Sequence, residues 1–423
     1  MVGFLLIGCA PLIADHFVVT FDIPKQVLND AWWLTLLTVG FVGISLPLRC
    51  GYGLLGSRHR FDIIQIYDTI PIILRLSMIV FLIFIDRLTI LYLGSIVYLS
   101  NLLGLFLIFR KGLNIFSANE ALSITKISRS ALYRIISLGS TALILTLSSA
   151  LLLQGSPMFI GYQIDTRSVT LLTIPIFILL SVTPFFQTFS VITSPIAAAT
   201  STNAEIGKLR ALYSRTSTYL CSAAFAIFLV YYVFGHIFLE AWLSGQSISK
   251  DNIGEMGRVL MILLFGHALS IAGSMSRSIL SSIGKHWFAA IADLLISLLG
   301  LAVGIILVIY FNMGIIGASL GITIALALRG MLIFPIFIAK YFKISPTKLI
   351  SGAILRPMAI ATIAIIGGEG IHTFCQVGKY SNMLILFMVW IIPALAWMLL
   401  TWRYVVRSDH RRELMRKING IAN

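Results

Sequence analysis

Several ionisable side chains lie inside apolar stretches of the sequence, where a charge is costly and usually faces a partner or a ligand. Arg75 lies about 14 residues, or roughly 21 Å along a helix, after the start of the apolar stretch 61–85. Asp68 precedes it by seven residues, so both would share one helix face. Because a guanidinium binds phosphate oxygens through paired hydrogen bonds, Arg75 is a candidate substrate-binding residue for an anion. A structural pairing of Arg75 with a carboxylate on a neighbouring helix stays open, and Asp68 is a candidate for ion coupling.

A second group of such residues occurs in the carboxy-terminal half. Asp293 starts a face with small residues at i+4, i+7 and i+11, a spacing typical of close helix packing. Its carboxylate is either a proton-coupling site or a buried group with hydrogen-bond partners. Arg329 lies about 11 residues from the end of its apolar stretch, so its side chain can extend to the membrane surface, and substrate binding is the alternative role. His267 is a coupling candidate, with simple packing as the competing interpretation.

Gln187 is the third substrate-binding candidate. It lies in the apolar stretch 168–192, which also contains Pro175 and Pro184. Prolines within a membrane helix free backbone carbonyls, which is tolerated where protein or water satisfies them. The pattern predicts a helix that lines a cavity, with Gln187 facing the substrate.

The composition predicts that these residues lie on helices that span a membrane. The chain has 423 residues, of which 58% are apolar and 11% charged, and its mean hydropathy is +0.98. Soluble domains have about 25% charged residues, so a soluble enzyme and a nucleic-acid binder are poor interpretations, and a β-barrel porin is equally poor. We predict an all-α polytopic membrane protein with about twelve transmembrane helices. The expected spans are 2–19, 31–48, 61–85, 88–109, 131–154, 168–192, 212–234, 256–279, 287–310, 313–339, 354–373 and 383–402.

The basic excess predicts an orientation. The net charge is +15, and with a cytoplasmic amino terminus 23 of the 31 Lys and Arg residues fall on the cytoplasmic side of these spans. Cytoplasmic loops are enriched in Lys and Arg, so both termini are predicted to be cytoplasmic. The charge is thus explained without nucleic acid as a partner.

Motifs for enzymatic chemistry are missing from the sequence. It contains no Walker motif, no His/Glu metal spacing on a helix and no nucleophile elbow. Its four cysteines lie far apart without paired spacing: Cys9, Cys50, Cys221 and Cys375. We therefore expect no enzyme activity, no cofactor and no metal site.

An internal repeat relates the two halves of the sequence. Residues 54–60, followed by Asp68, align at an offset of 225 positions with residues 279–285, followed by Asp293. The same offset superimposes three successive predicted spans, which indicates a parallel repeat of the kind found around transporter cavities. Chance alignment of hydrophobic helices is the alternative. The coinciding pairs are Leu55/Leu280, Ser57/Ser282, Arg60/Lys285 and Asp68/Asp293.

The repeat predicts a two-lobed transporter fold with unequal lobes. Spans five and six have no counterpart before Met1, so the first lobe is expected to lack two helices. The predicted parts are an incomplete lobe of four helices (1–112), a cytoplasmic linker (113–130), a six-helix lobe (131–345), two additional helices (346–405) and a basic cytoplasmic tail (406–423).

The chain resembles polysaccharide-specific flippases, the O-antigen repeat-unit translocases of the multidrug/oligosaccharidyl-lipid/polysaccharide exporter superfamily. The resemblance rests on residues 52–61 (YGLLGSRHRF), on TPFF at 183–186 followed by AAA at 197–199, and on GIIGAS at 314–319. It implies two six-helix lobes, often with two more helices. It also implies translocation of an undecaprenyl-diphosphate-linked oligosaccharide, an O-antigen or capsular repeat unit, from the cytoplasmic to the periplasmic leaflet by alternating access. The implied location is a bacterial inner membrane, and the implied partners are the lipid-linked oligosaccharide, membrane lipids and a polysaccharide polymerase.

Alternative functions remain open at this point. A drug or metabolite cation antiporter of the same superfamily would have the same fold, but its cavity should be dominated by carboxylates. A membrane glycosyltransferase or polymerase would need a large periplasmic loop with catalytic residues, and no connection is that long. A truncated remnant that transports nothing is the last alternative.

Overall fold

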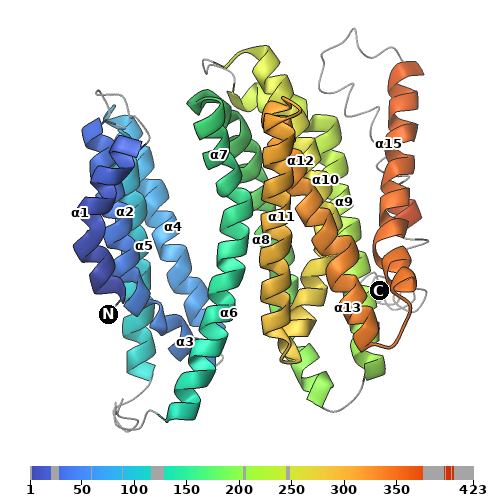
Figure 1. The fold of residues 1–423 in the computed structure, drawn as a ribbon, viewed down its shortest axis with the longest axis horizontal. Coiled ribbons are helices and arrows are strands. Elements are labelled where there is room, and N and C mark those ends of the chain that lie inside the picture. The colour runs from blue at the N-terminus through green and yellow to red at the C-terminus, as the bar shows by residue number, and fades with distance from the viewer. Residues whose placement is uncertain are drawn as a thin grey trace, which may run out of the picture. The chain divides into compact units, whose positions relative to one another are not determined.

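The computed structural model describes residues 2–20, 28–58, 60–87, 89–115, 128–202, 206–243, 248–374, 395, 397–401 and 403. These residues form helices and no strand, as predicted. Within them, nine helical segments are long and apolar enough to cross a membrane, and two shorter apolar helices cover Leu5–Val18 and Arg356–Gly367. The chain is therefore a polytopic helical membrane protein (Figure 1).

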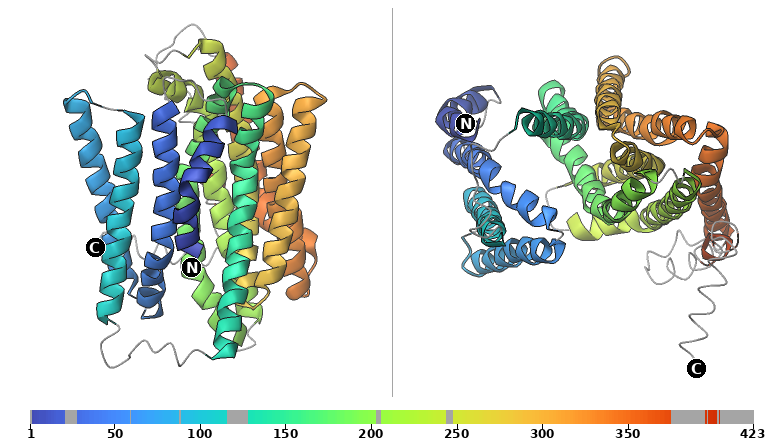
Figure 2. Two further views of the ribbon diagram at one scale, coloured as in Figure 1. Left: turned by 60° about the vertical axis from the view of Figure 1, so that its left-hand side comes forward. Right: turned by 90° about the horizontal axis from the view of Figure 1, so that it is seen from below.

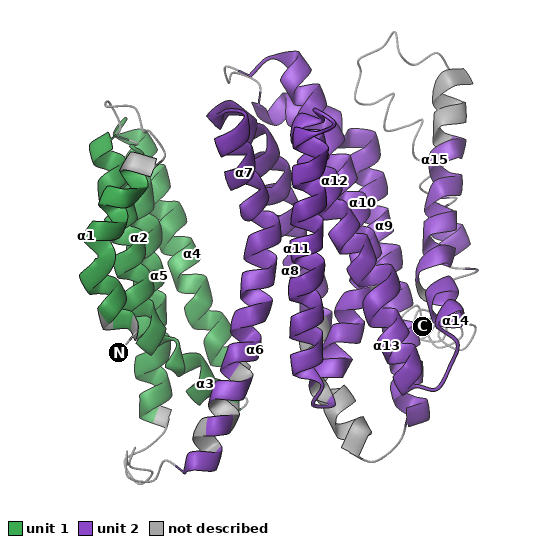
Figure 3. Cartoon of the chain, viewed as in Figure 1, with its two compact units in different colours: residues 1–127 green, residues 128–423 purple. Residues whose placement is uncertain are grey.

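The chain divides into two compact units, Met1–Ile127 and Ser128–Asn423 (Figure 3). In unit 1, α5 is central: it packs against α2, α3 and α4, and α1 packs against α2. Its helices are α1 (Val2–Thr20), α2 (Leu28–Leu48), α3 (Cys50–Ser57), α4 (Phe61–Phe84) and α5 (Ile90–Ile115).

Unit 2 is built around α10, which packs against α8, α9, α12 and a π-helical segment, η2. Helix α11 packs against α6 and α12, and α15 packs against α9. Seen along their axes, the long helices of this unit run nearly parallel to one another (Figure 2). The elements are α6 (Arg129–Leu153), α7 (Gly155–Gln163), α8 (Thr166–Thr202), α9 (Ile206–Leu243), α10 (Lys250–Ser282), α11 (His286–Ile309), α12 (Gly314–Ala327), η2 (Leu328–Ile333), α13 (Phe334–Tyr341), α14 (Pro346–Ile350), η3 (Ser351–Leu355) and α15 (Arg356–Phe374).

Small residues set the closest helix approaches in unit 2. Gly300 and Gly304 of α11 face Gly321 of α12, where an added Cβ would lie 2.5 Å from the Gly300 carbonyl oxygen. The predicted face that begins at Asp293 is therefore buried against a neighbouring helix, as its small residues indicated.

Eleven of the twelve predicted spans coincide with described helices, and 383–402 lies mostly outside the described residues. Two differ in form from the expectation. The predicted span 313–339 is interrupted by η2, and 354–373 is preceded by the short segments α14 and η3. The stretch with Pro175 and Pro184 is longer than predicted, since α8 continues without a break to Thr202.

The internal repeat is visible in the helix connections of the two units. Arg60 N–H donates to Leu55 O at 3.1 Å, and Lys285 N–H donates to Leu280 O at 2.9 Å, 225 positions later. The following helix ends agree too: Ile85 N–H donates to Phe81 O, and Tyr310 N–H to Ile306 O. The predicted offset of 225 positions thus relates helix ends with the same backbone hydrogen bonds in both units.

Candidate functional site

A cluster of charged side chains lies within unit 2 around Asp293 of α11. Arg277 of α10 donates through one terminal nitrogen to Asp293 Oδ2 at 3.1 Å. Arg329 of η2 places Nε 2.7 Å from Asp293 Oδ1 and donates through a terminal nitrogen to Ser297 Oγ at 3.0 Å. We call Arg277, Asp293 and Arg329 the Asp293 cluster. It explains how a carboxylate with 1% of its side chain exposed is accommodated.

The Asp293 cluster contains two cations for one anion. The Arg329 side chain is 12% exposed, whereas that of Arg277 is 33% exposed. Removing either charge from water is costly and is offset by the ion pair and the hydrogen bonds. The described groups of the cluster therefore leave a positive excess within the helices of unit 2.

Close packing directs Arg329 toward Asp293. Gly330 approaches the α10 backbone at Leu269 and Ser270, and Gly273 approaches the carbonyl of Arg329. The π-helical turn, with its extra residue per turn, occurs at this contact. The expectation that Arg329 extends to the membrane surface is wrong, because an internal carboxylate binds its guanidinium.

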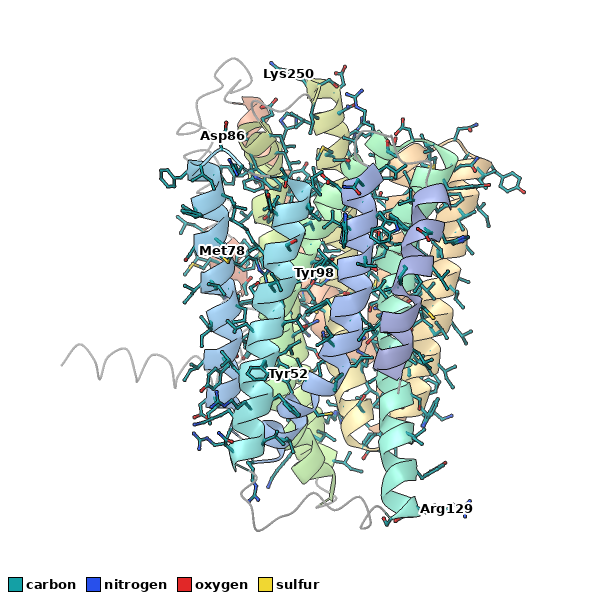
Figure 4. The ribbon with its side chains drawn as sticks, turned by 90° about the vertical axis from the view of Figure 1, so that its left-hand side faces the viewer. Tyr52, Met78, Asp86, Tyr98, Arg129 and Lys250 are labelled. Atoms are coloured by element: carbon teal, nitrogen blue, oxygen red, sulfur yellow. The ribbon has the colours of Figure 1, made fainter. Side chains whose placement is uncertain are left out.

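The equivalent carboxylate of unit 1 has a different donor. Tyr52 of α3 donates its hydroxyl hydrogen to Asp68 Oδ1 of α4. Tyr52 lies 225 positions before Arg277, just as Asp68 lies 225 positions before Asp293. In Figure 4, Tyr52 lies toward one end of unit 1, Asp86 lies at the other end and Tyr98 lies between them.

Arg75 is bound by a neutral partner. Its terminal nitrogen donates to Asn101 Oδ1 of α5 at 2.6 Å, and its Nε is buried without a hydrogen-bond partner among the described residues. The sequence alternatives for Arg75 were an anionic ligand or a carboxylate on a neighbouring helix; the observed partner is an amide. Asn101 was missed by the sequence analysis, and its only signal is an amide within the apolar helix α5.

His267 of α10 and Gln187 of α8 differ in burial, although the two helices pack against each other. His267 is 8% exposed, its ring meets Phe186 edge-on at 5.8 Å between centroids, and its Nε2 has no hydrogen-bond partner among the described groups. Gln187, the next residue after Phe186, is exposed. No observed hydrogen bond between described side chains joins either residue to the Asp293 cluster.

No group of three His, Cys, Asp or Glu side chains that could hold a metal ion occurs among the described residues. Outside the spans, Asp165 accepts a hydrogen bond from Ser168 N–H at 2.6 Å at the start of α8. This bond lowers the pKa of the Asp165 carboxyl below its ordinary value. The group is a helix cap rather than part of a binding site.

The described helices define a class: a polytopic helical membrane protein. Solved structures similar to the chain belong to transporters and flippases, not to enzymes. An inward-facing multidrug resistance MATE family transporter of the MOP superfamily is similar with a TM-score of 0.65 and 15% identity over 82% of this chain and 78% of that one. The lipid II flippase MurJ, in an inward closed conformation, has a TM-score of 0.59 and 14% identity over 95% of this chain and 83% of that one.

A MOP superfamily transporter from Pyrococcus furiosus is also similar, with a TM-score of 0.60 and 17% identity over 83% of this chain and 76% of that one. No model of a protein family matches the chain. No curated protein matches it either. At these identities the likeness establishes the fold shared with MOP superfamily transporters.

Proposed function

We propose that the chain translocates an undecaprenyl-diphosphate-linked oligosaccharide, an O-antigen or capsular repeat unit, from the cytoplasmic to the periplasmic leaflet of a bacterial inner membrane. Alternating access is the proposed mechanism, and both termini are cytoplasmic in this proposal. The similarity to the lipid II flippase MurJ along 95% of the chain supports a lipid-linked substrate. The resemblance of the sequence to O-antigen translocases supports the oligosaccharide class.

The observation that supports this function best is the state of Arg75. The Arg75 guanidinium lies within an apolar helix, its observed partner is an amide, and its buried Nε has no hydrogen-bond partner among the described residues. An uncompensated cation in such surroundings favours an anionic ligand, and a diphosphate offers oxygens in the geometry of the guanidinium fork. Arg75 is therefore the proposed substrate-binding residue, with Arg329 and Gln187 as further candidates.

Ion coupling is assigned in this proposal to Asp68, Asp293 and His267. Asp68 accepts a hydrogen bond from the neutral hydroxyl of Tyr52. Asp293 lies between two guanidinium groups, that of Arg277 at 3.1 Å and that of Arg329 at 2.7 Å. His267 is buried, and its Nε2 has no hydrogen-bond partner among the described groups.

A cation antiporter of the same superfamily is the rival function. The positive excess of the Asp293 cluster and the neutral partner of Arg75 both disfavour a cationic substrate. In the similar transporter from Pyrococcus furiosus, a reverse polarity of the binding pocket suggests a different function.

The test is leaflet transfer in vesicles. The purified full chain is reconstituted with an undecaprenyl-diphosphate oligosaccharide that has a fluorescent sugar, and transfer is followed by quenching with a membrane-impermeant reagent. We expect faster transfer than in protein-free vesicles and in vesicles with Arg75→Gln, while Arg87→Gln, a change at an exposed arginine just after α4, transfers normally. Uphill uptake of an organic cation without lipid transfer would establish the antiporter instead.

A further inference from the structure

The connection between α13 and α14 contains a lysine, Lys343, whose backbone has a positive φ angle. Lys343 adopts the left-handed conformation, with φ of 55°. Its N–H donates to Lys340 O at 3.2 Å, and the N–H of Ile344 donates to Ala339 O at 3.0 Å. These two bonds form a Schellman motif, in which the left-handed position is usually glycine.

The same motif occurs with glycine elsewhere in unit 2. Gly284, with φ of 82°, donates to Ser281 O at 3.1 Å, and Lys285 donates to Leu280 O at 2.9 Å. A side chain in the left-handed region is strained, and such strain persists when the surrounding structure fixes the conformation. Position 343 is thus a lysine where the motif at Gly284 has glycine and the motif at Asp86, with φ of 52°, has aspartate.

Buried anchors hold the connection on both sides of Lys343. Phe342 and Leu349 are buried in the core beside Tyr213, and Ile344 packs partly against the same core. Three lysines in this segment are exposed instead: Lys340, Lys343 and Lys348. We call these three residues the basic corner.

The basic corner lies at the end of an apolar span. The candidate span Gly314–Tyr341 ends between Lys340 and Lys343, and a further apolar helix starts at Arg356. The corner is at the end of unit 2 where α6 begins, away from Lys250 (Figures 1 and 4). A lysine at such a point reaches the level of lipid headgroups with its apolar stem along the helix.

The sequence around the basic corner contains basic residues and no acidic ones. No Asp or Glu occurs in the sequence between Asp293 and Glu369. Lys340, in the last turn of α13, already opposes the negative end of the helix dipole, so helix capping alone does not require a second cation at the strained position.

We propose that the basic corner is a docking site for an anionic phospholipid, with Lys343 as the residue that contacts the headgroup phosphate. The site is separate from the proposed transport function, because its ligand is a lipid of the surrounding membrane. Glycine at position 343 would relieve the strain but would remove a cation at headgroup level. Stability of the free protein and affinity for anionic lipid are therefore opposed at this position.

The experiment compares the full chain in nanodiscs of phosphatidylcholine alone and with phosphatidylglycerol added. Tryptophan fluorescence reports the melting temperature, and mass spectrometry of the protein released from the nanodiscs reports the phosphatidylglycerol that stays bound. Lys343→Gly should melt a few degrees higher than the native chain in phosphatidylcholine, and its apparent affinity for phosphatidylglycerol should fall at least threefold. Lys343→Arg should keep the native affinity, and Lys250→Gln, an exposed lysine at the opposite end, should behave like the native chain.

Two results would overturn the proposal. One is a Lys343→Gly protein with a higher melting temperature but an unchanged response to phosphatidylglycerol, which would make Lys343 a helix cap only. The other is equal stabilisation of the native chain by inorganic phosphate in phosphatidylcholine discs, which would identify the ligand as a free anion rather than a lipid.

Discussion

Tyr52 and Arg277 occupy equivalent positions of the internal repeat, and each donates a hydrogen bond to the carboxylate sixteen residues further along the chain. The acceptors are Asp68 and Asp293. In each unit the bond joins the two helices on either side of a turn, α3 and α4 in unit 1 and α10 and α11 in unit 2. The donor is a neutral phenol in unit 1 and a cation in unit 2, so the two equivalent helix connections differ in charge.

The first prediction concerns the hydrogen bond between Tyr52 and Asp68. Tyr52→Phe removes the donor and leaves the Asp68 carboxylate short of a hydrogen bond, which should destabilise unit 1 by about 1–3 kcal/mol. Thermal unfolding of the detergent-purified protein measures this loss. Tyr162→Phe, at a side chain that is 88% exposed, is the matched control and should have no effect; an equal loss in both variants would contradict the assigned role of Tyr52.

The second prediction concerns the Asp293 cluster. Asp293→Asn removes the charge that two guanidinium groups share, and breaking a buried pair from one side costs about 3–5 kcal/mol. We expect little folded Asp293→Asn protein. Arg277→Gln should be milder, because the Arg277 side chain is 33% exposed and Arg329 still pairs with the carboxylate. Monodisperse protein recovered by size-exclusion chromatography is the measurement, and a reversed order would contradict this account of the cluster.

A third prediction tests how Arg329 is positioned. At Gly330 an added Cβ would overlap the carbonyl of Leu269, so Gly330→Ala must separate η2 from α10. The loss of close packing should lower the melting temperature and weaken the pairing of Arg329 with Asp293. Gly254→Ala, a helical position with open space around it, should be neutral or stabilising by about 0.5–1 kcal/mol. Equal melting temperatures of the two variants would show that the close approach of Gly330 to α10 is not required for stability.

Parts of this arrangement could be predicted from the sequence, and parts could not. The helices follow from apolar stretches, and the buried face of Asp293 follows from small residues at helical spacing, because both signals are local. The pairing of Arg329 with Asp293 depends on the π-helical turn and on the approach of Gly330 to α10, and neither has a local signal. Asn101 was missed for the same reason: an amide becomes a partner of Arg75 only when α4 and α5 pack together.

The fourth prediction is a pH dependence outside the spans. The pKa of Asp165 is lowered by the hydrogen bond from Ser168 N–H, so the folded state favours the ionised carboxyl. The cap therefore contributes stability at pH values above the ordinary pKa of aspartate, and this contribution is lost as the pH falls through the lowered value. Melting temperatures of the native chain and of Asp165→Asn should differ at neutral pH and converge on acidification. A difference in melting temperature between the two proteins that grows as the pH falls would contradict the predicted direction of the pH dependence.

The last prediction separates a binding role of Arg75 from a structural one. If Arg75 binds the diphosphate, Arg75→Gln should abolish leaflet transfer while the amount of folded protein stays near normal, because the observed partner left behind is the neutral amide of Asn101 and not a charge. Arg75→Lys keeps the charge but loses the paired hydrogen bonds, so transfer should be strongly reduced there as well. Asn101→Leu removes the observed partner and leaves the guanidinium in place, so it should lower stability by about 1–3 kcal/mol with transfer retained in the folded fraction.

The opposite pattern would support a structural Arg75. In that case Arg75→Gln would reduce folded protein, the surviving fraction would still transfer lipid, and Asn101→Leu would give the same phenotype. Transfer per folded molecule, measured in vesicles with protein content determined by quantitative immunoblot, distinguishes the two patterns. Full transfer by Arg75→Gln at normal abundance would exclude both roles and remove the main argument from charge for an anionic substrate.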